Sequence, residues 1–180
     1  MELFSGRPLN IDNRLEREKR VYDLLDSVGI DYMRVDHEPA DNMEACLAID
    51  EVLEATICKN LFLCNRQKTN FYLVMMPGDK PFKTKEVSGQ IGCARLSFAG
   101  PEEMLEYLDI EPGSVSVMGL MNDKNNMVRL LVDEDILDAE YIGCHPCVNT
   151  SSLRLKTKDV FGPVLKAMNH DMTVIKLIGE

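Results

Sequence analysis

Apolar residues recur along the chain at two spacings, and each spacing predicts a different kind of element. Helical spacing predicts a first helix over residues 12–28, which ends at Gly29. Asn10 or Asp12 is placed to cap its first turn. Further helices are expected over residues 43–48, 84–89 and 158–168, and from residue 100 onward. Strands are expected over residues 32–37, 57–64, 71–76, 94–98, 114–117, 127–132, 140–142, 151–155 and 173–178.

The order of these elements favours an α+β fold over a doubly wound sheet. Strands outnumber helices and do not alternate strictly with them. With 180 residues and 45% apolar content, the chain can bury one sizeable core, and it shows no repeat, low-complexity tract or proline-rich linker. We therefore expect a single domain over residues 1–180, with its core from about 15 to 178.

The balance of charge narrows the classes of partner. A net charge of -10 opposes wide, sequence-independent contact with a phosphate backbone, which argues against DNA binding. Between Lys59 and Arg95, however, seven basic residues outweigh two acidic ones, a local balance of +5 that leaves -15 for the rest of the chain. This distribution suits one localised anion site, such as the end of a nucleic acid. The alternative is an ordinary solvated face of two hairpins.

Features that would send the chain to a membrane or out of the cell are not found. No run of 18 apolar residues occurs, and the segment from Met1 to Arg20 is too polar for a signal peptide. We therefore expect a cytoplasmic protein without a membrane partner. The six cysteines are too sparse for a disulfide scaffold, so we expect reduced thiols. Four of them are expected to fill the core as small buried groups: Cys46, Cys58, Cys64 and Cys93.

Three short stretches place polar or flexible residues where chemistry could occur. Lys59 interrupts an otherwise apolar strand, so its ammonium group either reaches the surface or faces a cleft that holds an anion. The turn before the strand at 114–117 contains Gly113, whose backbone could present N–H groups to an oxyanion or a phosphate. A plain turn is the simpler interpretation. The stretch 143–147 places His145 in a tight loop.

Two cysteines beside this histidine raise two further alternatives. Cys144 and Cys147 could bind a metal or act in redox chemistry, but a structural zinc site needs four ligands and no second Cys-x-x-Cys motif occurs. A cysteine hydrolase would need His145 to activate Cys144, and side chains of adjacent residues on a strand diverge. Both alternatives are retained as lesser ones.

Four strings follow one another in the order Cys58-Lys59-Asn60-Leu61-Phe62-Leu63, Pro112-Gly113-Ser114-Val115-Ser116, Gly119-Leu120-Met121-Asn122-Asp123 and Gly143-Cys144-His145-Pro146. In this order and content the chain resembles the YbaK/ProX family, which includes the editing domain inserted into bacterial prolyl-tRNA synthetases and its free-standing relatives. The resemblance runs from about Leu15 to Leu177 and takes in Asp79-Lys80 and the stretch 94–98. It implies a mixed, mostly antiparallel and barrel-like sheet with surrounding helices. The chain looks most similar to the free-standing ProX-type Ala-tRNA(Pro) deacylases.

The resemblance also implies a site. Lys59 matches the family's lysine on the core strand, Gly113 the first glycine of its Gly-x-x-x-Pro loop, and His145 the histidine before proline. These three are the expected catalytic residues. The expected substrate-binding residues are Ser114, Ser116, Val117, Met118 and Gly143. Val117 stands where the family usually has proline and Met118 where phenylalanine is common, a departure that bears on amino-acid specificity.

The activity implied by the resemblance is hydrolysis of alanine from mischarged tRNA(Pro), an aminoacyl-tRNA deacylase reaction of translation quality control. N–H groups of the Gly113 loop would stabilise the oxyanion as water attacks, and one well-aimed donor contributes about 3 kcal/mol. Lys59 would hold the terminal phosphate or orient the ester, and His145 would position the substrate while a ribose hydroxyl of the tRNA assists the water. No metal, cofactor or covalent intermediate is implied.

The partners implied are the 3′ end of aminoacylated tRNA(Pro) and, as a source of tRNA identity, prolyl-tRNA synthetase. A reading from another class remains open. The chain could be a non-catalytic regulatory module that binds an amino acid or an aminoacyl-tRNA, and the lost proline at Val117 is its best support.

Overall fold

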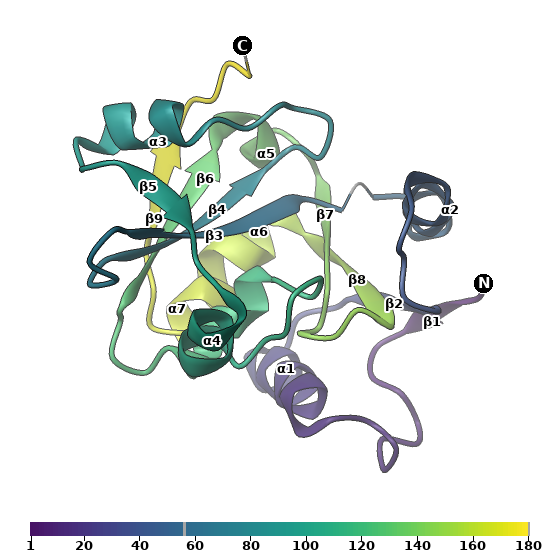
Figure 1. Cartoon of the computed structure of the whole chain (residues 1–180). Coiled ribbons are helices and arrows are strands. Elements are labelled where there is room, and N and C mark those ends of the chain that lie inside the picture. The colour runs from purple at the N-terminus through teal and green to yellow at the C-terminus, as the bar shows by residue number, and fades with distance from the viewer. Residues whose placement is uncertain (56, 180) are drawn as a thin grey trace.

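The computed structural model describes residues 1–55 and 57–179, and within them the strands form two sheets (Figure 1). One sheet has the strand order β1-β2-β8-β7 and the other the order β5-β3-β4-β6-β9. The strands are β1 Leu3–Ser5, β2 Met33–Asp36, β3 Lys59–Asn65, β4 Phe71–Met76, β5 Leu96–Phe98, β6 Val128–Asp133, β7 Tyr141–Cys144, β8 Ser151–Lys156 and β9 Met172–Ile175. The helices are α1 Glu16–Val28, α2 Met43–Leu53, α3 Thr84–Ile91, α4 Pro101–Glu103, α5 Glu134–Leu137, α6 Thr157–Asp159 and α7 Leu165–Ala167. A π-helical turn, Met104–Leu108, extends α4; another, Val160–Val164, joins α6 to α7; and a 3-10 helix spans Val117–Asn122.

Most strand pairings are antiparallel, and the parallel ones gather at one side of the larger sheet. The hairpin β3–β4 places Lys59 opposite Met76. Strand β4 then pairs parallel with β6, and β6 with β9. In the smaller sheet β7 pairs antiparallel with β8, which places Tyr141 opposite Lys156. The predicted α+β class with a mostly antiparallel arrangement is confirmed, and the structure adds that the strands divide between two sheets.

The two sheets touch where β3 begins beside β7. Ile57 forms an isolated bridge with Gly143, and the Cys58 N–H donates to the Gly143 carbonyl at 3.3 Å. A Cβ atom at position 143 would lie 3.0 Å from Cγ1 and 3.2 Å from Cα of Ile57. Any larger residue would therefore push the two segments apart, so glycine sets the closeness of this junction.

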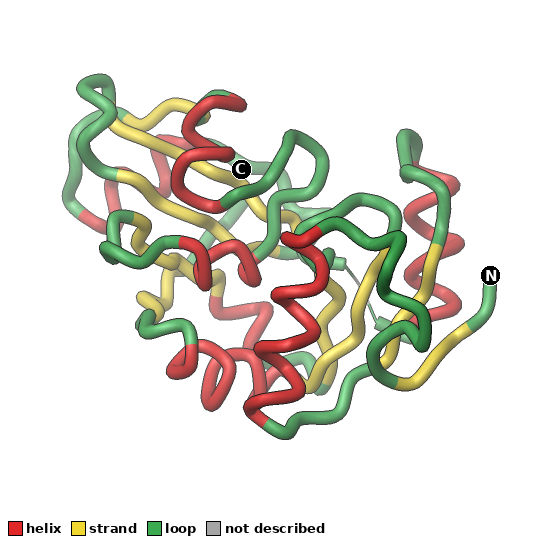
Figure 2. The backbone as a smooth tube through the Cα atoms, turned by 90° about the horizontal axis from the view of Figure 1, so that it is seen from below, coloured by secondary structure: helices red, strands yellow, loops and turns green. Residues whose placement is uncertain are grey.

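Helices pack on several sides of the sheets. Helix α1 packs against the turn Val160–Val164, and α1 lies with the C-terminal helical run on one side of the strands (Figure 2). Helix α2 packs on β2 and β8, and α3 packs beside β5. As the helical spacing predicted, α1 buries Val21 and Leu25 completely and ends at Gly29, whose φ is 80°. Within the described residues, no helix has both the length and the apolar character needed to cross a membrane.

Strand β4 runs through the middle of the core, and all of its residues are buried. It lies between β3 and β6. Its odd-numbered residues join the main core cluster, and its even-numbered residues join a second cluster with Val87 of α3. Because both faces are covered, the stretch is a continuous apolar run rather than an alternating one.

One predicted strand is wrong, and it lies in the loop of greatest functional interest. Residues 114–117 do not form a strand. The Ser116 hydroxyl accepts a hydrogen bond of 3.2 Å from the Met118 N–H and caps the 3-10 helix that begins at Val117. The alternation of serine and valine imitated a strand, whereas the capping serine marks a helix start.

Other differences concern the ends of elements. Helix α1 begins at Glu16 with Leu15 as its N-cap, so neither Asn10 nor Asp12 caps it. Helix α2 continues to Leu53, beyond the predicted range 43–48. Strand β1 was not predicted, because three residues are too few to show a pattern.

Candidate functional site

Lys59 is the first residue of β3 and lies at the junction of the two sheets. It directly follows Cys58, whose N–H is bonded to β7. The ammonium group of Lys59 donates a hydrogen bond of 2.9 Å to the carbonyl of Lys80, and the side chain is partly buried. The lysine is thus held against the neighbouring loop rather than extended into solvent.

The loop that holds Lys59 is fixed by an ion-pair network. The Lys80 ammonium group donates to Asp133 at 2.6 Å and to Asp135 at 2.8 Å. Its third hydrogen bond, of 2.7 Å, goes to the carbonyl of Leu177. Burial acts to lower the pKa of Lys80, but the two carboxylates outweigh it and raise that pKa above the usual 10.5. Asp133 is fully buried, so its negative charge depends on this cation.

Gly113 occupies the third position of a four-residue turn. The Ser114 N–H donates to the Glu111 carbonyl at 3.1 Å, and the φ angle of Gly113 is +89°. With Pro112 in the second position this is the type II pattern, in which the third position needs a positive φ. The N–H groups of Gly113 and Val115 have no hydrogen-bond partner in the described part of the chain. They are therefore free to donate to an oxyanion.

The residues that follow the turn point into the protein. Ser114 is buried, and Ser116, Val117 and Met118 are inaccessible to solvent. Val117 and Met118 belong to the main core cluster. Their influence on a bound amino acid would therefore act through packing beneath the loop. A hollow of about 350 Å³ lies beside Ser114, between the turn, the start of α1 and residues 147–150.

His145 follows β7 and is partly buried. Its Nδ1 lies 2.9 Å from the Ser151 carbonyl, which can only accept, so Nδ1 holds the proton and Nε2 is left as an acceptor. Nε2 has no hydrogen-bond partner among the described residues. Burial lowers the pKa of His145 below its usual 6.5; the hydrogen bond to Ser151 opposes this shift, and nearby His37 adds to it. The imidazole is therefore neutral at pH 7.

Strand β7 brings the three predicted catalytic regions together. Gly143 accepts the hydrogen bond from the residue before Lys59. The Ser116 hydroxyl lies within hydrogen-bonding reach of the Cys144 thiol, and a Cβ on Gly113 would come within 3.9 Å of Nδ2 of Asn149, in the loop after His145. Across the described residues no hydrogen bond joins Lys59, Gly113 and His145 directly. Each of the three is linked to β7 or to the loop that follows it only through neighbouring residues.

The nearby thiols are poor nucleophiles. Burial raises the pKa of Cys144 to about 12, and it raises the pKa of Cys58 to about 12 as well. Burial also raises the pKa of Cys147. A thiol at such a pKa is almost wholly protonated at neutral pH. Of the cysteines expected in the core, Cys58 and Cys64 are buried, and Cys46 and Cys93 are partly exposed.

A family model described as "Aminoacyl-tRNA editing domain" matches residues 37–161 of this chain. The chain belongs to this family. The predicted family is thereby confirmed, and with it the predicted class of activity, aminoacyl-tRNA editing. The matched range contains all three predicted catalytic residues and most of the two sheets, but it leaves out α1 and α7.

Individual relatives of this editing protein agree with the family model. "Prolyl-tRNA editing protein ProX" of Acetoanaerobium sticklandii is 28% identical over 163 residues, which cover 91% of this chain and 99% of that protein. "Prolyl-tRNA synthetase associated domain-containing protein 1" of Mus musculus is 28% identical over 166 residues, covering 90% and 95%. A crystal structure described as a candidate trans-editing enzyme for prolyl tRNA synthetase superposes with a TM-score of 0.66 at 17% identity, over 91% of this chain and 98% of the other. The last comparison shows the shared fold.

Two residues that lie beside His145 were not singled out from the sequence. His37 Nδ1 lies 2.7 Å from the Glu38 carbonyl, which leaves its Nε2 to accept a hydrogen bond of 2.8 Å from the Ser152 hydroxyl. The Ser152 oxygen is in turn 3.5 Å from Nδ1 of His145, and the two imidazole rings are 6.3 Å apart. His37 and Ser152 come together because β2 pairs with β8. A single sequence does not reveal which strands pair, so this contact could not be predicted.

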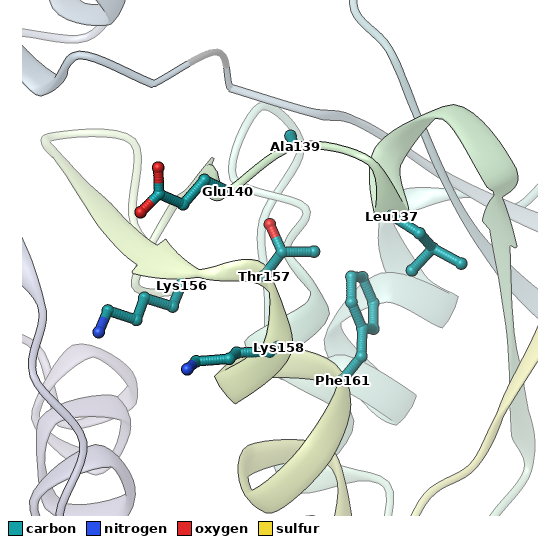
Figure 3. A pocket seen from close by; sticks show the side chains of 7 residues that line it. All are labelled: Leu137, Ala139, Glu140, Lys156, Thr157, Lys158 and Phe161. Carbon is teal, nitrogen blue, oxygen red and sulfur yellow. The ribbon is translucent and has the colours of Figure 1, made fainter.

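The hollow drawn in Figure 3 lies away from these residues. It has a volume of about 340 Å³ and adjoins the start of β7 and the end of β8, whereas His145 follows the end of β7. None of the predicted site residues lines it. The candidate site predicted from the sequence therefore lies apart from this hollow.

Proposed function

We propose that this editing protein hydrolyses alanine from mischarged tRNA(Pro), acting on the free aminoacyl-tRNA in the cytoplasm. The observation that supports this most directly is the match of residues 37–161 to the aminoacyl-tRNA editing family, a range that contains Lys59, Gly113 and His145. In the fold, Lys59 follows the residue bonded to Gly143 of β7, and the Gly113 turn lies beside the loop after His145. The relatives named for prolyl-tRNA editing and for association with prolyl-tRNA synthetase support the choice of tRNA.

The geometry gives each group a task in ester hydrolysis. The ester carbonyl would lie against the turn, where the free N–H groups of Gly113 and Val115 meet the oxyanion that forms as water attacks. A neutral His145 would accept a hydrogen bond from the substrate through Nε2. Lys59 would leave the Lys80 carbonyl to bind the terminal phosphate or the ester. A ribose hydroxyl of the tRNA would assist the attacking water.

The need for such a reaction follows from the limits of binding selectivity. A synthetase pocket built for a larger apolar side chain rejects a smaller one by only about 1 to 3 kcal/mol per missing methylene. A second site that admits alanine and excludes proline by its size restores accuracy. We further propose that prolyl-tRNA synthetase or the tRNA itself supplies the identity of the tRNA.

The test is release of labelled amino acid from Ala-tRNA(Pro) and Pro-tRNA(Pro) at fixed salt. Wild-type protein should release alanine and leave proline in place. Lys59→Ala should lower kcat/KM about 10- to 100-fold, because it removes a charged hydrogen-bonding group. Lys85→Ala, at an exposed lysine without an ion pair in the described part of the chain, is the matched control and should keep full activity.

Other outcomes separate the rival readings. If wild-type protein binds both Ala-tRNA(Pro) and Pro-tRNA(Pro) but hydrolyses neither ester, the alternative of a non-catalytic regulatory module would be favoured. Loss of activity after thiol alkylation would favour cysteine chemistry, and loss after treatment with a chelator would favour metal chemistry. The proposed mechanism uses neither, so neither treatment should change its rate. Full activity of Lys59→Ala would remove that lysine from the mechanism.

A further inference from the structure

The hollow at the far end of the β7–β8 pair has the composition of a nucleotide site (Figure 3). Lys156 and Lys158 extend from it on the same side, while Phe161 and Leu137 face each other across its other end. Thr157 lies between the two lysines in sequence and between the polar and apolar parts in space. The hollow thus combines positive charge with an aromatic surface.

Neither lysine is neutralised by the protein. Lys156 and Lys158 are both exposed, and in the part of the chain that the structure describes neither forms an ion pair. The Glu140 side chain lies at the same end of the hollow as the two lysines, above Lys156 in Figure 3, and it forms no ion pair in the described part of the chain. In a chain of net charge -10, two neighbouring lysines without carboxylate partners are available to an outside anion.

Thr157 supplies a second, independent observation. The residue is buried, and its hydroxyl oxygen has no hydrogen-bond partner among residues 1–55 and 57–179. Its backbone N–H is used, since it donates to the Glu140 carbonyl at 3.0 Å. Buried hydroxyl groups nearly always have a partner, so the free hydroxyl at the base of this hollow points to a missing one.

The position of the hollow fixes the kind of ligand that could occupy both sites. His145 follows Glu140 by five steps of largely extended chain, which is a distance of roughly 17 Å. An amino acid cannot span that distance. A single-stranded polynucleotide with its aminoacylated end at His145 can run along β7 and β8 and reach the hollow.

We propose that this hollow binds a nucleotide of the single-stranded 3′ end of the substrate tRNA, upstream of the aminoacylated residue. A base stacks on Phe161, Lys156 and Lys158 contact phosphates, and the Thr157 hydroxyl donates to a phosphate or ribose oxygen. The proposal rests on the proposed function, because it assigns to the tRNA a second contact outside the editing site.

The experiment compares a long and a short substrate. With Ala-tRNA(Pro), the double variant Lys156→Ala/Lys158→Ala should raise KM at unchanged kcat. The dependence of log KM on log salt should become shallower by about 1.4, or about 0.7 for each lost phosphate contact. Alanyl-adenosine lacks the upstream nucleotides, so its hydrolysis should not change. The matched control, Lys85→Ala/Lys166→Ala, removes two exposed lysines outside the hollow and should leave KM for both substrates as in wild type.

Single substitutions separate the contribution of base stacking to tRNA binding from that of charge. Phe161→Leu should raise KM for Ala-tRNA(Pro) about five-fold or more without changing the salt dependence. Glu140→Gln should lower KM, since it removes a negative charge from the rim. An equal effect of the lysine substitutions on alanyl-adenosine, or an unchanged KM for the tRNA, would overturn the proposal.

A measurement of RNA binding tests this proposal independently of catalysis. If wild-type protein hydrolyses neither substrate, the proposed function fails, but a fluorescein-labelled single-stranded RNA ending in CCA can still be titrated by anisotropy. Weaker binding by Lys156→Ala/Lys158→Ala than by the control pair would support the hollow as a nucleotide site. Equal binding by all three proteins would refute it.

Discussion

The protonation of His145 links the site's geometry to a measurable pH dependence. Burial holds the pKa of His145 below its usual 6.5, and His37 contributes to the shift. If the neutral form is active, kcat/KM for alanine release should stay level as the pH falls from about 8 to 6.5 and decline only below 6.5. His37→Gln keeps an acceptor for Ser152 but removes the imidazole that helps to lower the pKa of His145, so the decline should begin at a higher pH. A decline that already starts near pH 8 in wild type would contradict this assignment.

Single residues were predictable only where a motif surrounded them. Lys59, Gly113 and His145 stand in strings that resemble a known family, and each now lies next to β7 or its loops. His37 has no such string, and its contact with Ser152 spans 115 residues of sequence. No local pattern encodes a contact of that range, so this part of the site required the fold.

At the scale of elements, the Lys80 network anchors the loop that holds Lys59. Lys80→Met would leave Asp133 buried without its cation, which should lower the free energy of unfolding by about 3 to 5 kcal/mol in urea titrations. Lys80→Arg should recover part of this loss, because it restores the charge. Lys85→Met removes an exposed lysine from nearby α3 and should change stability little. A Lys80→Met protein as stable as wild type would show that the ion pair between Lys80 and Asp133 does not contribute to stability.

Strands and helices were predicted correctly where all residues of an element are buried alike. The prediction failed where a side chain forms a hydrogen bond with the backbone. Strand β4 was predicted with its observed ends, since both of its faces are buried and every position is apolar. The stretch 114–117 has the same local alternation as a strand, but the Ser116 hydroxyl caps the following helix. In such stretches, competition between side-chain and backbone hydrogen bonds decides whether a strand or a helix forms. The spacing of apolar residues carries no information about that competition.

At the scale of the whole molecule, one charged cluster ties the start of α1 to the smaller sheet. Asp36 of β2 accepts hydrogen bonds from Arg14 at 2.9 Å and from Ser151 of β8 at 2.5 Å, and it also pairs with Arg34. Burial acts to raise the pKa of Asp36, but these three partners hold it well below the usual 3.8. The ionised carboxylate therefore stabilises the fold above pH 3.8, and this stabilisation is lost as the pH falls below 3.8.

This cluster gives a stability prediction with a defined pH window. Asp36→Asn should lower the free energy of unfolding at pH 7 by about 2 to 3 kcal/mol, the usual loss for a hydrogen bond to a charged group. The difference between wild type and variant should shrink once the pH is below 3.8. Asp31→Asn, at an exposed aspartate, serves as the control. A constant difference down to pH 2 would mean that the carboxylate charge does not contribute.

The sequence gives the number and position of the charged residues, but it does not show which of them pair with each other in the folded protein. The excess of basic residues between Lys59 and Arg95 suggested one anion site. In the folded protein Lys59 donates to a carbonyl, Lys80 is neutralised by two aspartates and Lys68 pairs with Glu103. Two of the seven basic residues are thus neutralised by carboxylates of the protein itself, which a count along the sequence does not show.

The division of the strands between two sheets has a consequence for the spacing of the candidate site residues. Lys59 belongs to the larger sheet, whereas His145 extends from the smaller one, and the bridge between Ile57 and Gly143 lies beside both. The separation of the two groups is therefore a property of the angle between the sheets and not of either sheet alone. Because Ile142 and Leu153 of the smaller sheet share one core cluster with Leu73 of the larger sheet, packing of the core fixes that angle, and a core substitution far from both groups would change their separation.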